Sequence, residues 1–544
     1  MKNQSPVKII ICFFIILFGL SILPKKINAA QIAGSELTYS CTDTVGVYKI
    51  TLKVYRDCST AQLCSNCPVN LNASCSQQVT IYGSVAPFAG TNLGSVTLYV
   101  DTNVGVMDRV QLCNLVKSTC TNCGTRTAGT FSPGMEVYTF TGIADLRSLP
   151  NACCEVKIGY TNSFRNASIN TLVNPGTINY YNDLTINTCL SPCNSSPDFT
   201  LPSTIVVCAG QDIIHSFVTF DPDGDSLSYH LGSVMTGVNQ AAVYANPYTK
   251  TVPFSYLGAP LQSPPALPPV GINLDPVTGD FRVRPWLNFV SNLVVEINQW
   301  KMNGSNYQFV GQTRRDIEIH SVTCPANSPT VLKTYGANKI LTSPQPQYNQ
   351  VINATQQLCF TVVAWENAVI DDTTDLEIII PPTLVQTGAT ATPMYNKATR
   401  SINGPKYDSV LFCWTPPLTM ARTQPYYLTV KGSDRVCPLP GIMSHTIGIK
   451  VNGGSTGINK VEASKPFTIY PNPAKSLLNI QLEKAWNEKI FIEIFSVDGK
   501  QIQTSWLNPM ETQTSIKTDN MPSGMYFIRI NGSTVQYSQR FAVE

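Results

Sequence analysis

The chain has 544 residues, of which 43% are hydrophobic and only 13% are charged. Long solvent-facing helices need many Glu, Lys and Arg residues, so this composition argues against a helical protein and favours β-sandwiches with many turns. The formal net charge is +3, and removing the four lysines of residues 1–30 takes it to −1. No basic stripe is available for a nucleic-acid partner.

Residues 1–30 have the parts of a secretory signal peptide. Lys2 and Lys8 precede an apolar run at 9–23, and small residues follow at 28–30. The alternative is a retained membrane anchor, but the run is shorter than the roughly twenty apolar residues that span a bilayer. We therefore expect cleavage after Ala29 or Ala30 and an exported protein.

Cysteines concentrate in the first half of the chain. Thirteen lie between Cys41 and Cys208, four lie between Cys324 and Cys437, and residues 465–544 contain none. In an exported protein this distribution predicts disulfides, with one cysteine left over once Cys12 is removed with the signal peptide. Two CxxC pairs, at 64–67 and 120–123, leave zinc open as an alternative, although their separation far exceeds that of a zinc ribbon.

Residues 31–200 alternate in the manner of strands. Tyr48, Ile50, Leu52 and Val54 share one face of a predicted strand, and similar alternation recurs at 78–82 and 96–100. We predict a cysteine-rich β-domain here. The segments 34–39, 48–58, 164–166 and 194–208 resemble the N-terminal region of large, adhesin-like cell-surface proteins, which implies a surface location.

Two further sandwiches are expected, at 201–325 and 326–452. The first contains the loop at 219–229, with the sequence Thr-Phe-Asp-Pro-Asp-Gly-Asp-Ser-Leu-Ser-Tyr, and a Val-Thr-Gly turn at 277–279. These features resemble cadherin-like or immunoglobulin-like bacterial surface domains, and Cys208 and Cys324 stand where they could close the domain. The second is an immunoglobulin-like copy, from 358–364 through 412–416 to 427–434.

The loop at 219–229 holds a candidate calcium site. Asp221, Asp223 and Asp225 place three carboxylates within five residues, a density of oxygen ligands that suits Ca²⁺. The loop is not an EF-hand, because its glycine and its twelfth residue do not fit that pattern. The alternative is an exposed turn with solvated carboxylates. Glu296 and Asp316 are candidates for further ligands.

A glycine-rich linker is expected at 453–464, followed by a small β-module at 465–544. Its motifs are Tyr470-Pro-Asn-Pro473, Asp498-Gly-Lys500 and Pro522-Ser-Gly-Met-Tyr526. These residues resemble the type A C-terminal sorting domain of the type IX secretion system. The resemblance implies that the secretion machinery is a partner, and that the protein reaches the outer-membrane surface or the exterior of a Gram-negative bacterium.

Catalytic groups are hard to find in this sequence. Its four histidines form no His-Glu-x-x-His pattern, and a G-x-S-x-G match at 453–457 falls in the predicted linker rather than in a strand-to-helix turn. We therefore expect a non-enzymatic, all-β, multidomain surface protein that adheres to a surface, a polysaccharide or another cell. The alternatives are a secreted glycosidase or protease with an unrecognised site, and a structural component of the cell envelope.

Overall fold

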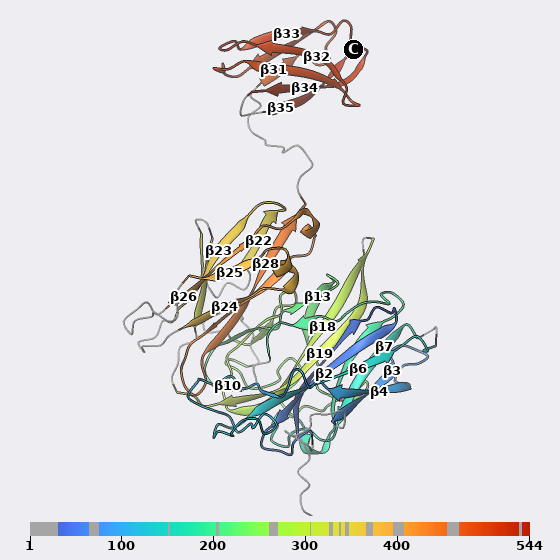
Figure 1. Cartoon of the computed structure of the whole chain (residues 1–544), viewed down its shortest axis with the longest axis vertical. Coiled ribbons are helices and arrows are strands. Elements are labelled where there is room, and N and C mark those ends of the chain that lie inside the picture. Colours follow the sequence, from blue (N-terminus) through green and yellow to red (C-terminus); the bar gives the residue numbers. More distant parts are fainter. Residues whose placement is uncertain are drawn as a thin grey trace, which may run out of the picture. The chain divides into compact units, whose positions relative to one another are not determined.

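A computed structural model describes most of the chain (Figure 1). The described residues are 31–64, 75–150, 153–202, 206–259, 270–304, 306–325, 330–336, 339–342, 348–365, 374–394, 407–453, 467–532 and 536–544. The predicted signal peptide, and all of the predicted linker except Gly453, lie outside these residues. The chain divides into two compact units, Met1–Gly454 and Ser455–Glu544, which we call the N-terminal and C-terminal units.

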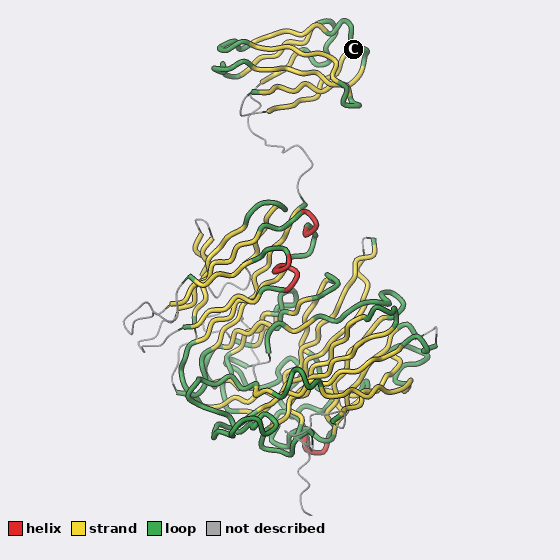
Figure 2. Tube along the Cα trace, viewed as in Figure 1, coloured by secondary structure: helices red, strands yellow, loops and turns green. Residues whose placement is uncertain are grey.

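Strands dominate both units, so the predicted all-β fold class is confirmed (Figure 2). The first part of the N-terminal unit contains β1 (Ile32–Cys41), β2 (Val47–Asp57), β3 (Ser76–Gly83), β4 (Asn92–Val100), β5 (Met107–Asp108), β6 (Met135–Asp145), β7 (Glu155–Asn162), the 3₁₀ turn η2 (Pro175–Thr177) and β8 (Tyr180–Asn187). The middle part contains β9 (Asp198–Phe199), β10 (Val206–Cys208), β11 (Ile213–Ser216), β12 (Thr219–Phe220), β13 (Ser226–Leu231), β14 (Met235–Gly237), β15 (Gln240–Ala241), β16 (Ile272–Leu274), β17 (Asp280–Val283), β18 (Phe289–Asn303) and β19 (Asn306–Val322).

Eight of these strands form a closed ring of antiparallel pairings. The order is β19, β1, β2, β6, β4, β3, β7 and β8, and β8 pairs again with β19. The alternation predicted for residues 48–54 is confirmed, because Tyr48, Ile50, Leu52 and Val54 are all fully buried on the inner face. Side chains from the facing strands, such as Phe140 and Ile158, complete this core.

The sheet continues across residue 200, where the first domain boundary was predicted. β19 pairs with β1 through Gly34 opposite Ile317. The two backbones approach so closely that a Cβ at position 34 would lie 2.6 Å from the carbonyl oxygen of Asp316, so only glycine fits. Hydrogen-bonded strands therefore join residues 31–200 to residues 201–325.

The last part of the N-terminal unit is a two-sheet sandwich. It contains β20 (Val331–Gly336), β21 (Lys339–Thr342), β22 (Tyr348–Asn353), β23 (Leu358–Trp365), β24 (Asp375–Ile379), α2 (Pro382–Gln386), β25 (Thr390–Pro393), β26 (Tyr407–Trp414), η4 (Leu418–Met420), β27 (Tyr426–Ser433) and β28 (Ile442–Asn452). Phe412 and Trp414 of one sheet pack with Leu428 and Ile449 of the other. The second of these sheets also includes β11, which pairs with β28, so strand pairing crosses residue 325 as well.

The C-terminal unit is a smaller sandwich with its own core. It contains β29 (Phe467–Tyr470), β30 (Leu477–Leu482), β31 (Ile490–Ser496), β32 (Gln501–Leu507), β33 (Gln513–Lys517), β34 (Gly524–Asn531) and β35 (Gln536–Val543). One sheet has the order β29-β30-β33 and the other β32-β31-β34-β35. Alternating residues such as Ile480, Ile492 and Ile528 point inward and are fully buried.

Disulfides connect distant parts of the N-terminal unit. The closure predicted between Cys208 and Cys324 is confirmed. A disulfide joins Cys113 and Cys437, which are 324 positions apart. Cys153 is a buried free thiol, which agrees with the one cysteine expected to be left over once Cys12 is removed. The other pairs among the described residues are Cys41–Cys193, Cys58–Cys120, Cys64–Cys75, Cys154–Cys189 and Cys359–Cys413.

The zinc alternative does not fit this pairing. Cys64 and Cys120, one from each CxxC pair, are both in disulfides and have no free thiolate for a metal. In the part of the chain that the structure describes, no helix is long and apolar enough to cross a membrane.

Candidate functional site

Asp221 organises the acidic loop between β12 and β13. Its Oδ1 accepts the backbone N–H groups of Asp223 and Asp225, both at 3.0 Å, which is the Asx-turn geometry that Asp favours. Its Oδ2 accepts the side-chain amide of Gln299 at 3.0 Å. The side chain is buried, and this burial raises the pKa of Asp221 to about 7.

The other two carboxylates of the loop point elsewhere. Asp223 Oδ2 accepts the backbone N–H of Ser195 at 2.6 Å, so this side chain ties the loop to the segment before β9. Asp225 Oδ2 is buried without a hydrogen-bond partner. Burial raises the pKa of Asp225, and the nearby charge of Asp223 adds to this effect, while Lys301 opposes it.

Calcium binding by this loop stays a prediction. Among the described residues, three acidic, cysteine or histidine ligand atoms come within 4.8 Å of one another only at Cys58, Cys120 and Glu136, and there the two cysteines form a disulfide. The three aspartates of the loop do not form such a set. The suggested further ligands face arginines, Glu296 toward Arg314 at 3.3 Å and Asp316 toward Arg165 at 2.7 Å.

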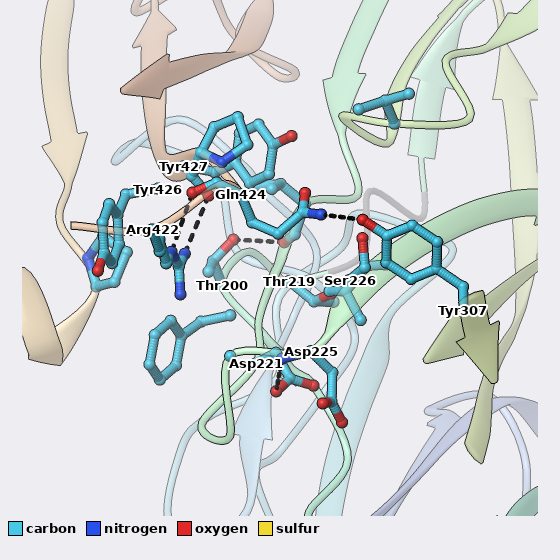
Figure 3. A pocket seen from close by; sticks show the side chains of 17 residues that line it. Thr200, Thr219, Asp221, Asp225, Ser226, Tyr307, Arg422, Gln424, Tyr426 and Tyr427 are labelled. Atoms are coloured by element: carbon cyan, nitrogen blue, oxygen red, sulfur yellow. Dashed lines mark hydrogen bonds between the residues drawn. The ribbon is translucent and has the colours of Figure 1, made fainter. Parts of the chain in front are cut away.

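A cavity of about 310 Å³ lies directly beside the acidic loop (Figure 3). Most of its wall comes from three parts of the N-terminal unit: the loop and strands at 218–227, the β18–β19 hairpin, and the segment 422–427 that leads into β27. Thr200, Val277 and Pro381 complete the lining. In Figure 3, Arg422 and Tyr307 lie on opposite sides, with Asp221 and Asp225 at the lower edge. The labelled lining residues are Thr200, Thr219, Asp221, Asp225, Ser226, Tyr307, Arg422, Gln424, Tyr426 and Tyr427.

Arg422 is the cation of this cavity. Its Nε and Nη2 donate to the backbone oxygens of Gln424 and Pro425 at 3.1 and 3.0 Å, and its guanidinium lies 3.6 Å from the ring centre of Tyr426. Burial lowers the pKa of Arg422. These contacts fix the plane of the guanidinium and leave Nη1 with no protein acceptor among the described residues.

Gln424 and Tyr307 join two walls of the cavity. The amide of Gln424 donates to the Tyr307 hydroxyl at 2.7 Å, which links the 422–427 segment to the β18–β19 hairpin. Gly224 has φ of +77°, and a Cβ there would meet Arg422 Nη1 at 3.3 Å. A glycine at this turn therefore allows the arginine to approach the acidic loop.

A local sequence motif marks only the acidic side of this cavity, which is the loop with Asp221, Asp223 and Asp225. The rest of the lining could not be recognised in this way. Arg422, Gln424 and Tyr427 lie more than a hundred positions from the aspartates, and Tyr307 lies at the end of a hairpin. No local motif marks them. Only the pairing of distant strands brings them together.

The Phe-Arg-Asn segment at 164–166 has a structural role. Arg165 pairs with Asp316, and the amide of Asn166 donates to Glu318 at 2.8 Å; all four side chains are buried. Similarly, Arg315 pairs with Glu36 of β1 at 2.8 Å. Arg165, Asn166 and Glu36, which belong to the segments behind the adhesin-like resemblance, thus hold β19 in the fold.

The four histidines lie in different parts of the N-terminal unit. His215 is buried, and this burial lowers its pKa to about 3. His320 contacts Glu318 at 2.6 Å, and His445 lies 3.8 Å from Asp280. The exposed His230 contacts Ser228, whose oxygen also accepts the indole N–H of Trp300.

In the C-terminal unit, the first sequence motif contacts a distant strand and the other two build turns. Asn472 Oδ1 accepts the N–H of Ala542 at 2.8 Å, which ties the first motif to β35. Ser496 N–H donates to the Lys500 oxygen at 2.9 Å around the second motif. The Tyr526 hydroxyl donates to the Pro522 oxygen at 2.7 Å within the third.

Residues 468–544 match the family model described as the secretion system C-terminal sorting domain. The C-terminal unit is a sorting domain. This assignment confirms the resemblance to type IX sorting domains and implies export to the cell surface or the extracellular space. It also implies an interaction between the sorting domain and the type IX secretion machinery. No curated protein matches the chain.

Solved structures give only distant likenesses to the whole chain. The cadherin-like domains 1 to 4 of zebrafish RET are 9% identical, with 82% of this chain and 94% of that one covered and a TM-score of 0.19. Four N-terminal Ig domains of Dscam1 isoform 7.44 are 10% identical, with 94% and 99% covered and a TM-score of 0.17. An endo-fucoidan hydrolase of glycoside hydrolase family 107 is 13% identical, with 64% and 44% covered and a TM-score of 0.14. Likenesses this weak support no argument about function.

Proposed function

We propose that this exported surface protein is a non-enzymatic adhesin-like protein that binds a surface, a polysaccharide or another cell. The observation that carries the proposal is the pairing of a sorting domain with an N-terminal unit that is tied into one body by disulfides and shared sheets. Such a body resists unfolding outside the cell and presents its loops and cavity in fixed positions.

Adhesion of the purified protein tests this proposal. Beads coated with the protein should bind to polysaccharide-coated surfaces or to bacterial cells more strongly than beads coated with the separate sorting domain. Equal binding of both kinds of bead to every surface would contradict the adhesin role. Clustering of protein-coated beads with one another, without any added surface, would instead favour a structural component of the envelope.

A secreted hydrolase is the second candidate, and one observation favours it. Asp221 borders a cavity and has a pKa raised to about 7, the range that suits a general acid in a glycosidase. Against it, both carboxylate oxygens of Asp221 already accept hydrogen bonds from the protein. A screen of glycosidase and protease substrates decides between the two: turnover that Asp221→Asn abolishes would establish the hydrolase.

A further inference from the structure

The cavity beside the acidic loop contains groups of opposite hydrogen-bonding character. Arg422 Nη1 is a donor with no protein acceptor in the described part of the chain, while Asp225 Oδ2 is an acceptor with no protein donor there. Asp221 also lines the cavity, but both of its carboxylate oxygens accept hydrogen bonds from the protein. The two kinds of group are neighbours, because Arg422 Nη1 lies close to Gly224, which stands between the two aspartates in the sequence. Yet Arg422 makes no ion pair within 4.0 Å to a described carboxylate. Arg422 is therefore not neutralised by a direct ion pair, and Asp225 Oδ2 is the carboxylate oxygen that has no protein partner.

This combination discriminates between ligand classes. An anion such as phosphate would be repelled by the aspartates whenever these are ionised, and a simple cation would be repelled by Arg422. An apolar ligand would leave the guanidinium and the carboxylates desolvated and without partners, which is costly. A hydroxyl group both donates and accepts, so several hydroxyls on one ligand satisfy both sides of the cavity together.

Aromatic rings supply the remaining surface. Tyr307 is 47% exposed at the hairpin end, and Tyr427 lines the opposite side. Tyr426 also lines that side, but its ring is buried beneath the Arg422 guanidinium. Rings of this kind offer flat apolar area beside a polar edge. The volume of about 310 Å³ falls at the lower end of the range for small-ligand pockets, which is roughly 300–1,000 Å³. A ligand of one or two sugar rings has this mixture of hydroxyls and apolar ring faces.

We propose that the cavity bounded by Asp221, Asp225, Tyr307, Arg422 and Gln424 binds an uncharged mono- or disaccharide unit. The proposal rests on the proposed adhesin function and names the ligand class for it. Gln424 contributes an amide that is oriented by the Tyr307 hydroxyl, so the carbonyl oxygen of the same side chain is left to accept from the ligand. The site exists only because the three segments fold into one unit.

Saturation-transfer NMR of the purified protein with maltose, cellobiose, mannobiose, xylobiose and chitobiose tests the site. We expect at least one of these disaccharides to bind, and we expect Arg422→Met to weaken it by about tenfold or more, because a charged donor is lost. Met keeps most of the stem over Tyr426. Tyr307→Ala should also weaken binding, and its exposed position makes it safe for folding.

Two matched controls accompany these variants. Arg147→Met removes an exposed arginine elsewhere, and Tyr99→Ala removes a tyrosine that is 49% exposed on β4. Both should bind the disaccharide as the unaltered protein does. The site is overturned if no disaccharide binds at millimolar concentration, or if the cavity variants and the controls weaken binding equally. Binding of inorganic phosphate or glycine with the same dependence on Arg422 would overturn the ligand class.

The adhesion assay separates this proposal from the proposed function. Adhesion that is lost in Arg422→Met and Tyr307→Ala supports both. Adhesion that persists unchanged in both variants overturns the cavity as the binding site while the adhesin role stands. Disaccharide binding without adhesion to any surface supports the site and contradicts the adhesin role.

Discussion

The two units of this protein are stabilised in different ways. The N-terminal unit has disulfides and at least four buried arginine–carboxylate pairs, in which each side chain is 4% exposed or less: Arg56–Glu136, Arg165–Asp316, Arg314–Asp183 and Arg315–Glu36. The sorting domain contains no cysteine, and its core is a cluster of apolar side chains. The N-terminal unit therefore depends on covalent and ionic links between distant segments, whereas the sorting domain depends on local apolar burial.

This contrast fits the different requirements of the two units. Disulfides form only in an oxidising compartment, so the N-terminal unit reaches full stability after it leaves the cytoplasm. The fold of the sorting domain needs no oxidation. Hydrogen exchange followed by mass spectrometry reports the stability of each unit separately in the intact chain, and it is the readout for the next three predictions.

Loss of the longest disulfide should have the largest effect. Cys113→Ser with Cys437→Ser opens a loop of 324 positions, for which the chain-entropy model gives a loss of about 6 kcal/mol. We expect the free energy of unfolding of the N-terminal unit to fall by roughly this amount and that of the sorting domain to stay unchanged. A similar loss in both units would contradict the contrast.

Breaking a buried ion pair should have the next largest effect. Arg165→Met leaves Asp316 buried without its main cationic partner, which typically costs about 3–5 kcal/mol. The control is Arg147→Met, which breaks the exposed pair with Asp145 and should not measurably change stability. If the two variants behaved alike, the buried pair would not contribute as described.

Replacing both partners, in Arg165→Met with Asp316→Leu, sharpens this test. The double variant leaves no unpaired charge, so it should recover part of the stability that Arg165→Met loses. No recovery would mean that the cost comes from packing rather than from the unpaired carboxylate.

Protonation of Asp221 should produce a smaller, pH-dependent effect. Its pKa is raised to about 7 in the folded protein, above the value of about 3.9 for an unfolded chain, so the folded state binds the proton more tightly. The stability of the N-terminal unit should therefore decrease as the pH rises from about 4 to about 7. Asp221→Asn should remove this contribution, and the sorting domain should not show it. An unchanged slope in Asp221→Asn would contradict the assignment.

We expect calcium to have the smallest effect on stability. A thermal unfolding assay measures it. If Ca²⁺ binds at Asp221, Asp223 and Asp225, millimolar calcium should raise the unfolding temperature of the N-terminal unit near neutral pH. The increase should disappear in Asp225→Asn. No change with calcium would leave the loop as an Asx turn organised by Asp221.

Local sequence patterns were sufficient for part of this structure. Alternation placed Tyr48, Ile50, Leu52 and Val54 on the buried face of β2, because one face of a strand in a closed sheet must be apolar. The second and third motifs of the sorting domain were equally readable, since each builds a turn within a few residues, as Pro522 and Tyr526 do.

Long-range features could not be read in the same way. The pairing of Gly34 with Ile317 and the disulfide between Cys113 and Cys437 depend on which distant strands meet, and periodicity shows only which face of a strand is buried. The cavity has the same origin, since Asp221 and Arg422 are separated by about two hundred positions. The sequence indicated the acidic loop, but it did not indicate the arginine that lies beside it.

The most direct test of the account is the location of the protein in its own cells. The full chain should be released or sensitive to protease added outside the cells, whereas a chain that ends at Gly453 should be retained in the periplasm, because it lacks the sorting domain. If both chains reach the surface equally, residues 468–544 do not direct export, and the central claim is wrong.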